Sequence, residues 1–174
     1  MYETGTGVSV TKETYRKITG LVREHPKRIR LLETGNRILT GGVFISYPLF
    51  LISLAFGRHK FFWRAVFVPA VSFLVVTLFR KCINAPRPYE KFGMPPVLKK
   101  DTAGNSFPSR HVFSVFIIAM TEGYCYPVLG FLLCIAGAAM GVLRVIGGVH
   151  EVRDVTVGAL VGIACGIAGF YIFI

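Results

Sequence analysis

The chain has 174 residues, of which 53% are hydrophobic, and its mean hydropathy is +0.57. This apolar content is more than a soluble core of that size can bury, so the composition excludes an ordinary soluble domain and indicates a protein of the lipid bilayer. The formal net charge of +11 does not indicate nucleic acid, because no soluble domain interleaves aromatic with basic residues. Anionic lipid head groups and phosphate-bearing substrates are the better partners for this charge.

The first predicted element is a basic amphipathic helix that begins after Thr11, a suitable N-cap, and ends before Pro26. Three apolar residues share one face of this helix: Tyr15, Ile18 and Leu21. Beside a membrane span, the pattern favours a helix lying on the membrane surface over an ordinary solvated basic helix. We therefore assign residues 1–36 to a basic N-terminal tail with an interfacial helix, and residues 37–174 to a transmembrane domain.

Apolar stretches of about 20 residues are long enough to cross the hydrocarbon core as helices. Four stretches meet this requirement: Arg37–Phe56, Phe61–Phe79, Tyr126–Ile146 and Val155–Ile174. A fifth, from Val112 to about Glu122, is shorter but continues an element that begins near Pro108. The sequence predicts an all-α integral-membrane helical bundle of five transmembrane helices plus the N-terminal amphipathic interfacial helix.

Two polar segments, residues 80–106 and residues 144–153, carry most of the candidate functional side chains. The first follows two predicted crossings and the second follows four. An even number of crossings returns the chain to the same side of the membrane. Both segments are therefore predicted to face one side.

The first polar segment contains Arg80 at the predicted end of a span and Arg87 seven residues later. Two guanidinium groups in this arrangement can converge on one anion, and arginine binds phosphate through bidentate charged hydrogen bonds. Positive residues that merely flank a membrane helix are the alternative, and for these two residues taken alone it is favoured.

The second candidate site lies where the third span begins, at Pro108, Ser109, Arg110 and His111. A helix N-terminus presents free N–H groups to an anion, Ser109 adds a hydroxyl group, and His111 adds a titratable proton. A plain Pro-Ser helix start with an incidental histidine is an equally good interpretation of this segment by itself.

The third candidate site combines Arg144, His150 and Asp154. If His150 begins or precedes the last helix, Asp154 lies one turn further along the same face and can accept the proton of one ring nitrogen. The other nitrogen is then oriented as a nucleophile. A structural His-Asp pair at the membrane interface is the alternative, but ionisable groups near a span favour function.

Together the three segments resemble the signature of the type-2 phosphatidic acid phosphatase superfamily, which is Lys-x6-Arg-Pro, Pro-Ser-Gly-His and Ser-Arg-x5-His-x3-Asp. Here the corresponding residues are Arg80-x6-Arg87-Pro88, Pro108-Ser109-Arg110-His111 and Leu143-Arg144-x5-His150-x3-Asp154. The order, the internal spacing and the position at span ends all agree. The resemblance extends from about Phe61 to the C-terminus.

The resemblance implies that His150 attacks phosphorus and becomes phosphorylated, that Asp154 orients it, and that His111 is the general acid and later the base. The groups implied to hold the phosphate oxygens are Arg80, Arg87, Arg144, Ser109 and the backbone N–H of Arg110. Neither a metal nor another cofactor is expected, because phosphoryl transfer needs mainly positioning and charge neutralisation.

Three positions depart from the family pattern. Arg80 replaces a lysine and keeps the charge with a different donor geometry. Arg110 replaces a glycine, which places a bulky cation beside the pocket and is expected to affect substrate preference. Leu143 replaces a serine and removes one hydroxyl donor, and we expect at most a reduced activity.

The expected function is hydrolysis of a phosphorylated membrane lipid, with four candidates: a polyprenyl diphosphate such as undecaprenyl diphosphate, phosphatidate, phosphatidylglycerol phosphate or a lipid A phosphate. A catalytically silent anionic-lipid-binding or transport protein is the alternative. The basic tail favours a cytoplasmic site by the positive-inside tendency. The resemblance implies an extracytoplasmic site in a bacterial inner (plasma) membrane, and we adopt that orientation. The sequence leaves the oligomeric state open.

Overall fold

The computed structural model describes residues 10–57, 60–100 and 102–172, and all of its regular secondary structure is helical. The helices are α1 Lys12–Arg23, α2 Pro26–Phe56, α3 Phe62–Ile83, α4 Pro88–Phe92, α5 Arg110–Cys125, α6 Pro127–Ile146 and α7 Val152–Ile167, which continues directly into the π-helical turn η1 Ala168–Ile172. The prediction of an all-helical chain is confirmed for these residues.

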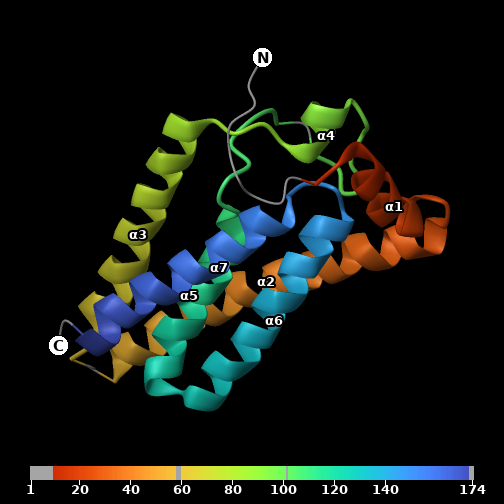
Figure 1. The fold of residues 1–174 in the computed structure, drawn as a ribbon. Coiled ribbons are helices and arrows are strands. Elements are labelled where there is room, and N and C mark those ends of the chain that lie inside the picture. Colours follow the sequence, from red (N-terminus) through yellow and green to blue (C-terminus); the bar gives the residue numbers. More distant parts are fainter. Residues whose placement is uncertain (1–9, 58–59, 101, 173–174) are drawn as a thin grey trace.

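The centre of the bundle is α5, which packs most extensively against α6 and α7 and also contacts α2 and α3 (Figure 1). Glycines allow the close approach of α7 to α5. A Cβ atom at Gly158 would lie 2.7 Å from the carbonyl oxygen of Ser109, and one at Gly162 would lie 2.7 Å from that of Phe113. Small residues at such crossings let helix backbones meet in a membrane. This packing brings the first turn of α7 against the first turn of α5.

Among the described residues, four segments are long and apolar enough to cross a membrane. They are Pro26–Phe56, Phe62–Phe92, Pro127–Ile146 and Val152–Ile172. The remaining predicted span corresponds to α5, which has 16 residues and is therefore only about 24 Å long. A helix of this length does not establish a fifth span. Its shortness is explained by its central position, because a helix enclosed by its neighbours does not have to match the thickness of the bilayer.

The N-terminal region has the predicted helix cap at Thr11 and a second helix that begins at Pro26. The N–H of Thr14 donates to the hydroxyl of Thr11 at 3.2 Å, which confirms the cap, and Pro26 begins α2. No break occurs at residue 37, because α2 is continuous from Pro26 to Phe56. The buried face of α1 consists of Tyr15, Thr19 and Val22.

The apolar face of Tyr15, Ile18 and Leu21 coincides only in part with the face that packs on the bundle. Leu21 is 62% exposed. Thr19 can be buried because its hydroxyl donates to the carbonyl of Tyr15 within the same helix at 2.8 Å, which satisfies its polar group.

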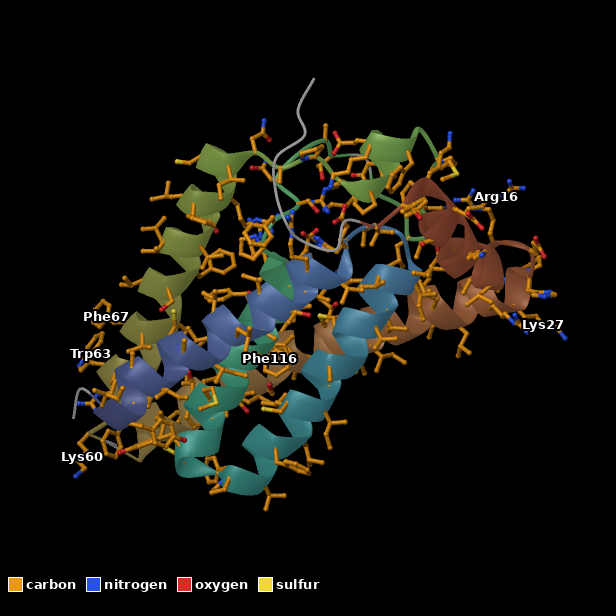
Figure 2. The ribbon with its side chains drawn as sticks, in the orientation of Figure 1. Arg16, Lys27, Lys60, Trp63, Phe67 and Phe116 are labelled. Atoms are coloured by element: carbon orange, nitrogen blue, oxygen red, sulfur yellow. The ribbon has the colours of Figure 1, made fainter. Side chains whose placement is uncertain are left out.

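The two ends of the bundle carry different side chains (Figure 2). Trp63 and Phe67 stack on the outer side of α3 near Lys60, with ring centroids 5.7 Å apart. Aromatic residues are enriched at membrane–water interfaces, and these two mark one of them. Arg16 and Lys27 point outward at the opposite end. Residues 58 and 59 of the predicted hairpin link lie outside the described residues.

Candidate active site

The two polar segments lie against each other at one end of the bundle, as the count of crossings predicts. The N–H of Ser106 donates to the carbonyl of Ala85 at 2.9 Å, and the N–H of Ser109 donates to the carbonyl of Asp154 at 2.8 Å. Both N–H groups of Val97 and Leu98 donate to the carbonyl of Gly147, at 3.0 and 3.1 Å. These backbone contacts hold all three motifs around one site.

His150 and Asp154 form a buried pair at the start of α7. The Nδ1 atom of His150 lies 3.3 Å from Oδ2 of Asp154, and the two residues are 4% and 2% exposed. The N–H of Glu151 also donates to Oδ2 at 3.2 Å, so the carboxylate is fixed from two directions. Since Nδ1 faces the carboxylate, Nε2 is the ring nitrogen left with a lone pair for attack.

Ser106 is a further member of the site, and the sequence did not single it out. Its hydroxyl donates to Oδ2 of Asp154 and lies 3.4 Å from Nδ1 of His150. It is 1% exposed. The hydroxyl residue beside the Pro-Ser motif was visible in the sequence, but no spacing rule connects it to a carboxylate 48 residues away. Ser106 is a positioning residue, because it acts on the carboxylate that orients His150.

Ser109 and Arg144 present polar atoms to the site that have no protein partner. In the described part of the chain, Oγ of Ser109 and Nε of Arg144 are buried without a hydrogen bond. Ser109 makes no side-chain cap to α5, which argues against a role as a plain N-cap. Buried donors without a partner are costly, and a ligand anion would satisfy both of them.

Arg80 and Arg87 are buried, at 6% and 5% exposure, so they are not simple flanking charges. The Arg80 guanidinium donates to the carbonyls of Asn105, Ser106 and Pro108. Arg87 donates through Nε to the carbonyl of Gly104 and through Nη1 to that of Val149, each at 3.1 Å. Each guanidinium has five N–H groups, so both keep donors for an anion while they brace the loops.

Arg110 and Lys100 extend the positive charge of the site. Arg110 is exposed, and its guanidinium carbon lies 5.5 Å from the ring centroid of Phe73 on α3. The pKa of the Lys100 ammonium is lowered, first by partial burial and then by the nearby charges of four arginines: Arg87, Arg144, Arg110 and Arg80. Lys100 was not predicted as a site residue, because it lies in no motif and its position depends on the docking of Leu98 against Gly147.

The two histidines of the site, His111 and His150, are neutral near pH 7. Burial lowers the pKa of His150 to about 4, although Asp154 opposes this effect. Burial also lowers the pKa of His111 to about 3, followed by the positive charge of Arg144. Neutrality suits His150 as a nucleophile. His111 must gain a proton to act as an acid, and a phosphate dianion among these cations would favour that proton by opposite charge.

Glu151 connects the loop that carries His150 to α4. Its carboxylate is 4% exposed and pairs with the ammonium of Lys91 at 2.6 Å. The nearby carboxylate of Glu90 accepts from the N–H of Arg87 at 2.7 Å and from the N–H of Gly104. Both acidic side chains are therefore engaged by protein groups. No group of three or more His, Cys, Asp or Glu side chains suited to a metal ion occurs in the described ranges.

An apolar cavity of about 470 Å³ lies between α2, α3 and α5 and reaches the first residues of α5. Its polar end is formed by Arg110 and His111. The other lining residues are mainly apolar and include Phe44, Leu51, Val66, Phe73 and Ile118. A pocket with a hydrophobic body and a few charged groups at one end suits a ligand that is itself amphipathic.

The fold, the apolar helices and the three motifs define an integral membrane protein of a known class. Residues 61–174 match the PAP2 superfamily, and the chain belongs to that family. The resemblance drawn from the sequence is confirmed.

Three known proteins are similar to this chain in sequence or in structure. The bacitracin transport permease protein BcrC of Bacillus licheniformis is 28% identical over 110 residues, which cover 61% of this chain and 54% of that protein. The chain thus spans about half the length of this curated relative. The crystal structure of Aquifex aeolicus LpxE superposes with a TM-score of 0.72 at 25% identity, covering 92% of this chain and 94% of that one.

The third relative is a transmembrane PAP2-type phosphatidylglycerolphosphate phosphatase of Bacillus subtilis. Its structure gives a TM-score of 0.68 at 20% identity, covering 91% of this chain and 82% of that one. This likeness shows the fold alone. The family relationship as a whole supports a lipid phosphatase.

Proposed function

We propose that the chain removes a phosphate group from a membrane lipid through a phosphohistidine at His150. The observation that carries this proposal is the buried His150–Asp154 pair beside Ser109 Oγ and Arg144 Nε, which lack protein partners. An oriented neutral imidazole next to unsatisfied anion donors is the arrangement that nucleophilic attack on a phosphate requires. A silent lipid-binding protein would not need such a nucleophile.

In the first step, Nε2 of His150 attacks phosphorus and forms a P–N bond as the P–O bond to the lipid breaks. His111 gives its proton to the leaving oxygen. In the second step, the now neutral His111 takes a proton from water, and the water oxygen attacks phosphorus. The P–N bond breaks, its electron pair returns to His150, and inorganic phosphate leaves. Asp154 holds the His150 ring in one orientation throughout both steps.

The phosphate oxygens are held by the guanidinium groups of Arg80, Arg87 and Arg144, the hydroxyl of Ser109 and the backbone N–H of Arg110. These cations can neutralise the charge of the transferring group without a metal, and we propose metal-independent catalysis. The side chain of Leu143 packs against the apolar cluster that contains Leu32 and Val149. Its replacement of the family's serine exchanges a hydroxyl donor for packing.

The apolar cavity supports a substrate whose tail stays in the bilayer while its head group reaches the histidines. We propose a lipid phosphomonoester or diphosphate: a polyprenyl diphosphate, phosphatidate, phosphatidylglycerol phosphate or a lipid A phosphate. Arg110, where the family has glycine, adds a charge that favours a second phosphate or another anionic group.

Release of inorganic phosphate by the purified protein tests the proposal. With excess EDTA, we expect wild-type protein to release phosphate from dioleoyl phosphatidate or farnesyl diphosphate at the rate seen without the chelator. Activity that EDTA removes and Mg²⁺ restores would contradict metal independence. No release from either lipid or from phosphatidylglycerol phosphate would favour the silent binding protein.

We further propose that the site faces the extracytoplasmic side of a bacterial inner membrane. Cysteines introduced at Lys12 and at Lys60 in a cysteine-free chain lie near opposite ends of the bundle. A membrane-impermeant maleimide added to intact cells should label the cysteine at position 12 and spare the one at position 60. The reverse pattern would place the site in the cytoplasm.

A further inference from the structure

The helix α1 lies outside the residues that match the PAP2 superfamily, yet it contacts the loop that carries the nucleophile. Tyr15 is 3% exposed, and its hydroxyl donates to the carbonyl of Gly148 at 3.2 Å. The Tyr15 ring also packs against Phe92, the last residue of α4, with centroids 5.4 Å apart. One side chain of α1 thus connects α4 with the loop that carries Gly148.

The contact between α1 and this loop leaves no free space. Gly148 has a φ of +73°, and a Cβ atom there would lie 2.6 Å from the Tyr15 hydroxyl oxygen and 3.0 Å from Cγ2 of Thr19. Val22 packs in one apolar cluster with Val149, the residue before the nucleophile. The backbone of residues 148 and 149 is therefore fixed by α1 on one side, and His150 follows directly.

The C-terminal end of α1 is held by two further contacts. Arg23 donates to the carbonyl of Pro95 in the loop before Val97. Arg28 on α2 donates to the carbonyl of Leu21 at 2.7 Å. A displacement of α1 would consequently move the Pro95 loop and the Gly148 carbonyl together.

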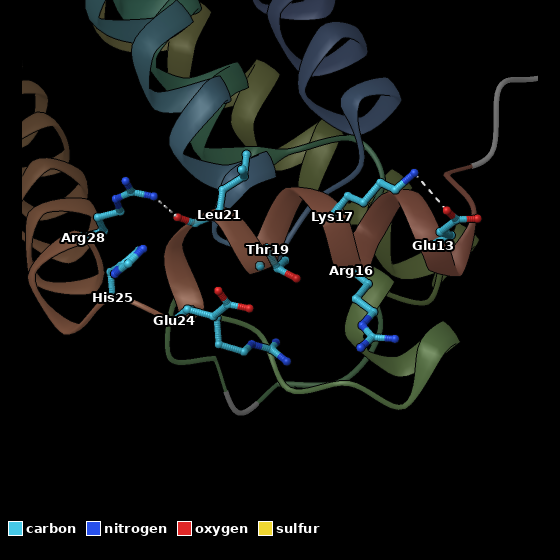
Figure 3. Close-up of a pocket in the computed structure, with 10 residues that line it drawn as sticks. Glu13, Arg16, Lys17, Thr19, Leu21, Glu24, His25 and Arg28 are labelled. Carbon is cyan, nitrogen blue, oxygen red and sulfur yellow. Dashed lines mark hydrogen bonds and ion pairs between the residues drawn. The ribbon is translucent and has the colours of Figure 1, made fainter.

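The outer side of α1 and the first turns of α2 form a basic face (Figure 3). We define it by its exposed cations: Lys12, Arg16, Lys17, Arg23, Lys27, Arg28 and Arg30. Glu13 and Glu24 are the acidic residues among them, and Glu13 pairs with Lys17 at 2.9 Å. Several of these side chains line a cleft of about 690 Å³ between α1 and the start of α2. Positive charge predominates on this face.

Exposed apolar side chains accompany this charge. Leu21 is 62% exposed and Leu31 is 74% exposed. Leu31 lies near the start of the candidate span Pro26–Phe56, and this places the basic face at the membrane-surface end of that span. Cations combined with exposed leucines at this depth match anionic lipid head groups above an apolar layer. A soluble polyanion would contact the cations but leave the leucines in water.

We propose that the basic face binds anionic lipid head groups of the surrounding bilayer, and that this binding steadies the His150 loop through the Tyr15–Gly148 contact. Anionic lipid then raises turnover without being the substrate. The effect on turnover rests on the function proposed above, whereas the lipid binding does not. Tyr15 is a positioning residue in this scheme, because it touches the loop and not the phosphate.

The full chain in nanodiscs provides the test. Discs of phosphatidylcholine alone are compared with discs in which about one-third of the lipid is phosphatidylglycerol. Hydrogen exchange of residues 12–23 reports lipid binding without any need for activity. Hydrolysis of p-nitrophenyl phosphate at saturation reports kcat, which a changed local concentration of the substrate does not affect. We expect phosphatidylglycerol to slow exchange in α1 about fivefold and to raise kcat about threefold.

Three variants separate the two parts of the proposal. R16Q/K17Q should lose both effects, whereas the matched control K81Q/K99Q, which removes two exposed lysines elsewhere on the same end, should keep both. Y15F keeps the ring but not the hydroxyl, so it should keep the slower exchange and lose the rise in kcat.

Unchanged exchange in α1, or an equal change in R16Q/K17Q, would overturn the lipid-binding face. Full stimulation of Y15F would overturn the coupling. Absence of any phosphate release by the wild type would count against the proposed function and the coupling together, and the exchange data would still decide lipid binding.

Discussion

Replacing His150 with alanine should reduce phosphate release by at least about 10⁴-fold. The substitution removes the atom that forms the covalent bond to phosphorus. Initial rates with dioleoyl phosphatidate in detergent micelles provide the measurement. Activity within about tenfold of the wild type would show that His150 is not the nucleophile.

A second histidine provides the control for this substitution. His25 lies on the exposed link between α1 and α2. His25→Gln should change the rate by no more than about twofold, because surface substitutions away from a site have small effects. A loss in both variants would indicate a general defect in the protein and not the removal of a nucleophile.

The pH dependence gives an independent check on the same residue. The pKa of His150 is lowered to about 4, so the ring is neutral and able to attack above that pH and is protonated below it. The acid limb of the profile of kcat/KM should therefore lie near pH 4 and not near 6.5, the ordinary pKa of histidine. The measurement requires a substrate whose own ionisation is known and subtracted.

Replacing His111 with glutamine should reduce turnover of a lipid alkyl phosphate by about 10² to 10⁴-fold. The expected loss is smaller for p-nitrophenyl phosphate, because p-nitrophenolate leaves readily without a proton. The comparison of the two substrates in wild type and His111→Gln is the measurement. Equal losses for both substrates would contradict the role of His111 as the acid in the first step.

The His111 variant also tests the second step. If His111 activates water, the loss with p-nitrophenyl phosphate should appear mainly after the first turnover, as a burst of p-nitrophenolate followed by a slow steady rate. Rapid-mixing measurements at enzyme concentrations comparable with the product formed would show it. A slow first turnover with no burst would assign His111 to binding.

Local spacing made part of the site predictable. His150 lies just before α7 and Asp154 in its first turn, so a separation of four residues places the two side chains close together. The convergence of the two polar segments followed from counting crossings, which needs only the lengths of apolar stretches. The all-helical fold followed from the bilayer, because helices satisfy their own backbone hydrogen bonds.

Contacts made by irregular backbone were not predictable. Arg80 bonds to carbonyls of residues 105, 106 and 108, and Ser106 bonds to Asp154. Both arrangements depend on the path of a long loop that no periodic pattern describes. Lys100 enters the site for the same reason, since its position follows from the contact of Leu98 with Gly147.

The side of α1 that packs on the bundle was not predictable from its amphipathic pattern. Leu21 is more apolar than Thr19, yet Thr19 is buried and Leu21 is exposed. The tight contact at Gly148 accepts the small threonine side chain, whose hydroxyl is satisfied within the helix. The shape of the loop at Gly148 determines which side of α1 packs on the bundle. This loop lies more than a hundred residues away in the sequence.

Trapping of the covalent intermediate tests the central claim most directly. The purified protein is mixed with ³²P-labelled p-nitrophenyl phosphate, whose leaving group needs no proton in the first step, then quenched with alkali after a few milliseconds and digested for mass spectrometry. His111→Gln, in which the second step is slow, should accumulate the most label. We predict an acid-labile, alkali-stable phosphate on His150, absent from His150→Ala. Rapid phosphate release with no label on His150, or with label on another residue, would contradict the account.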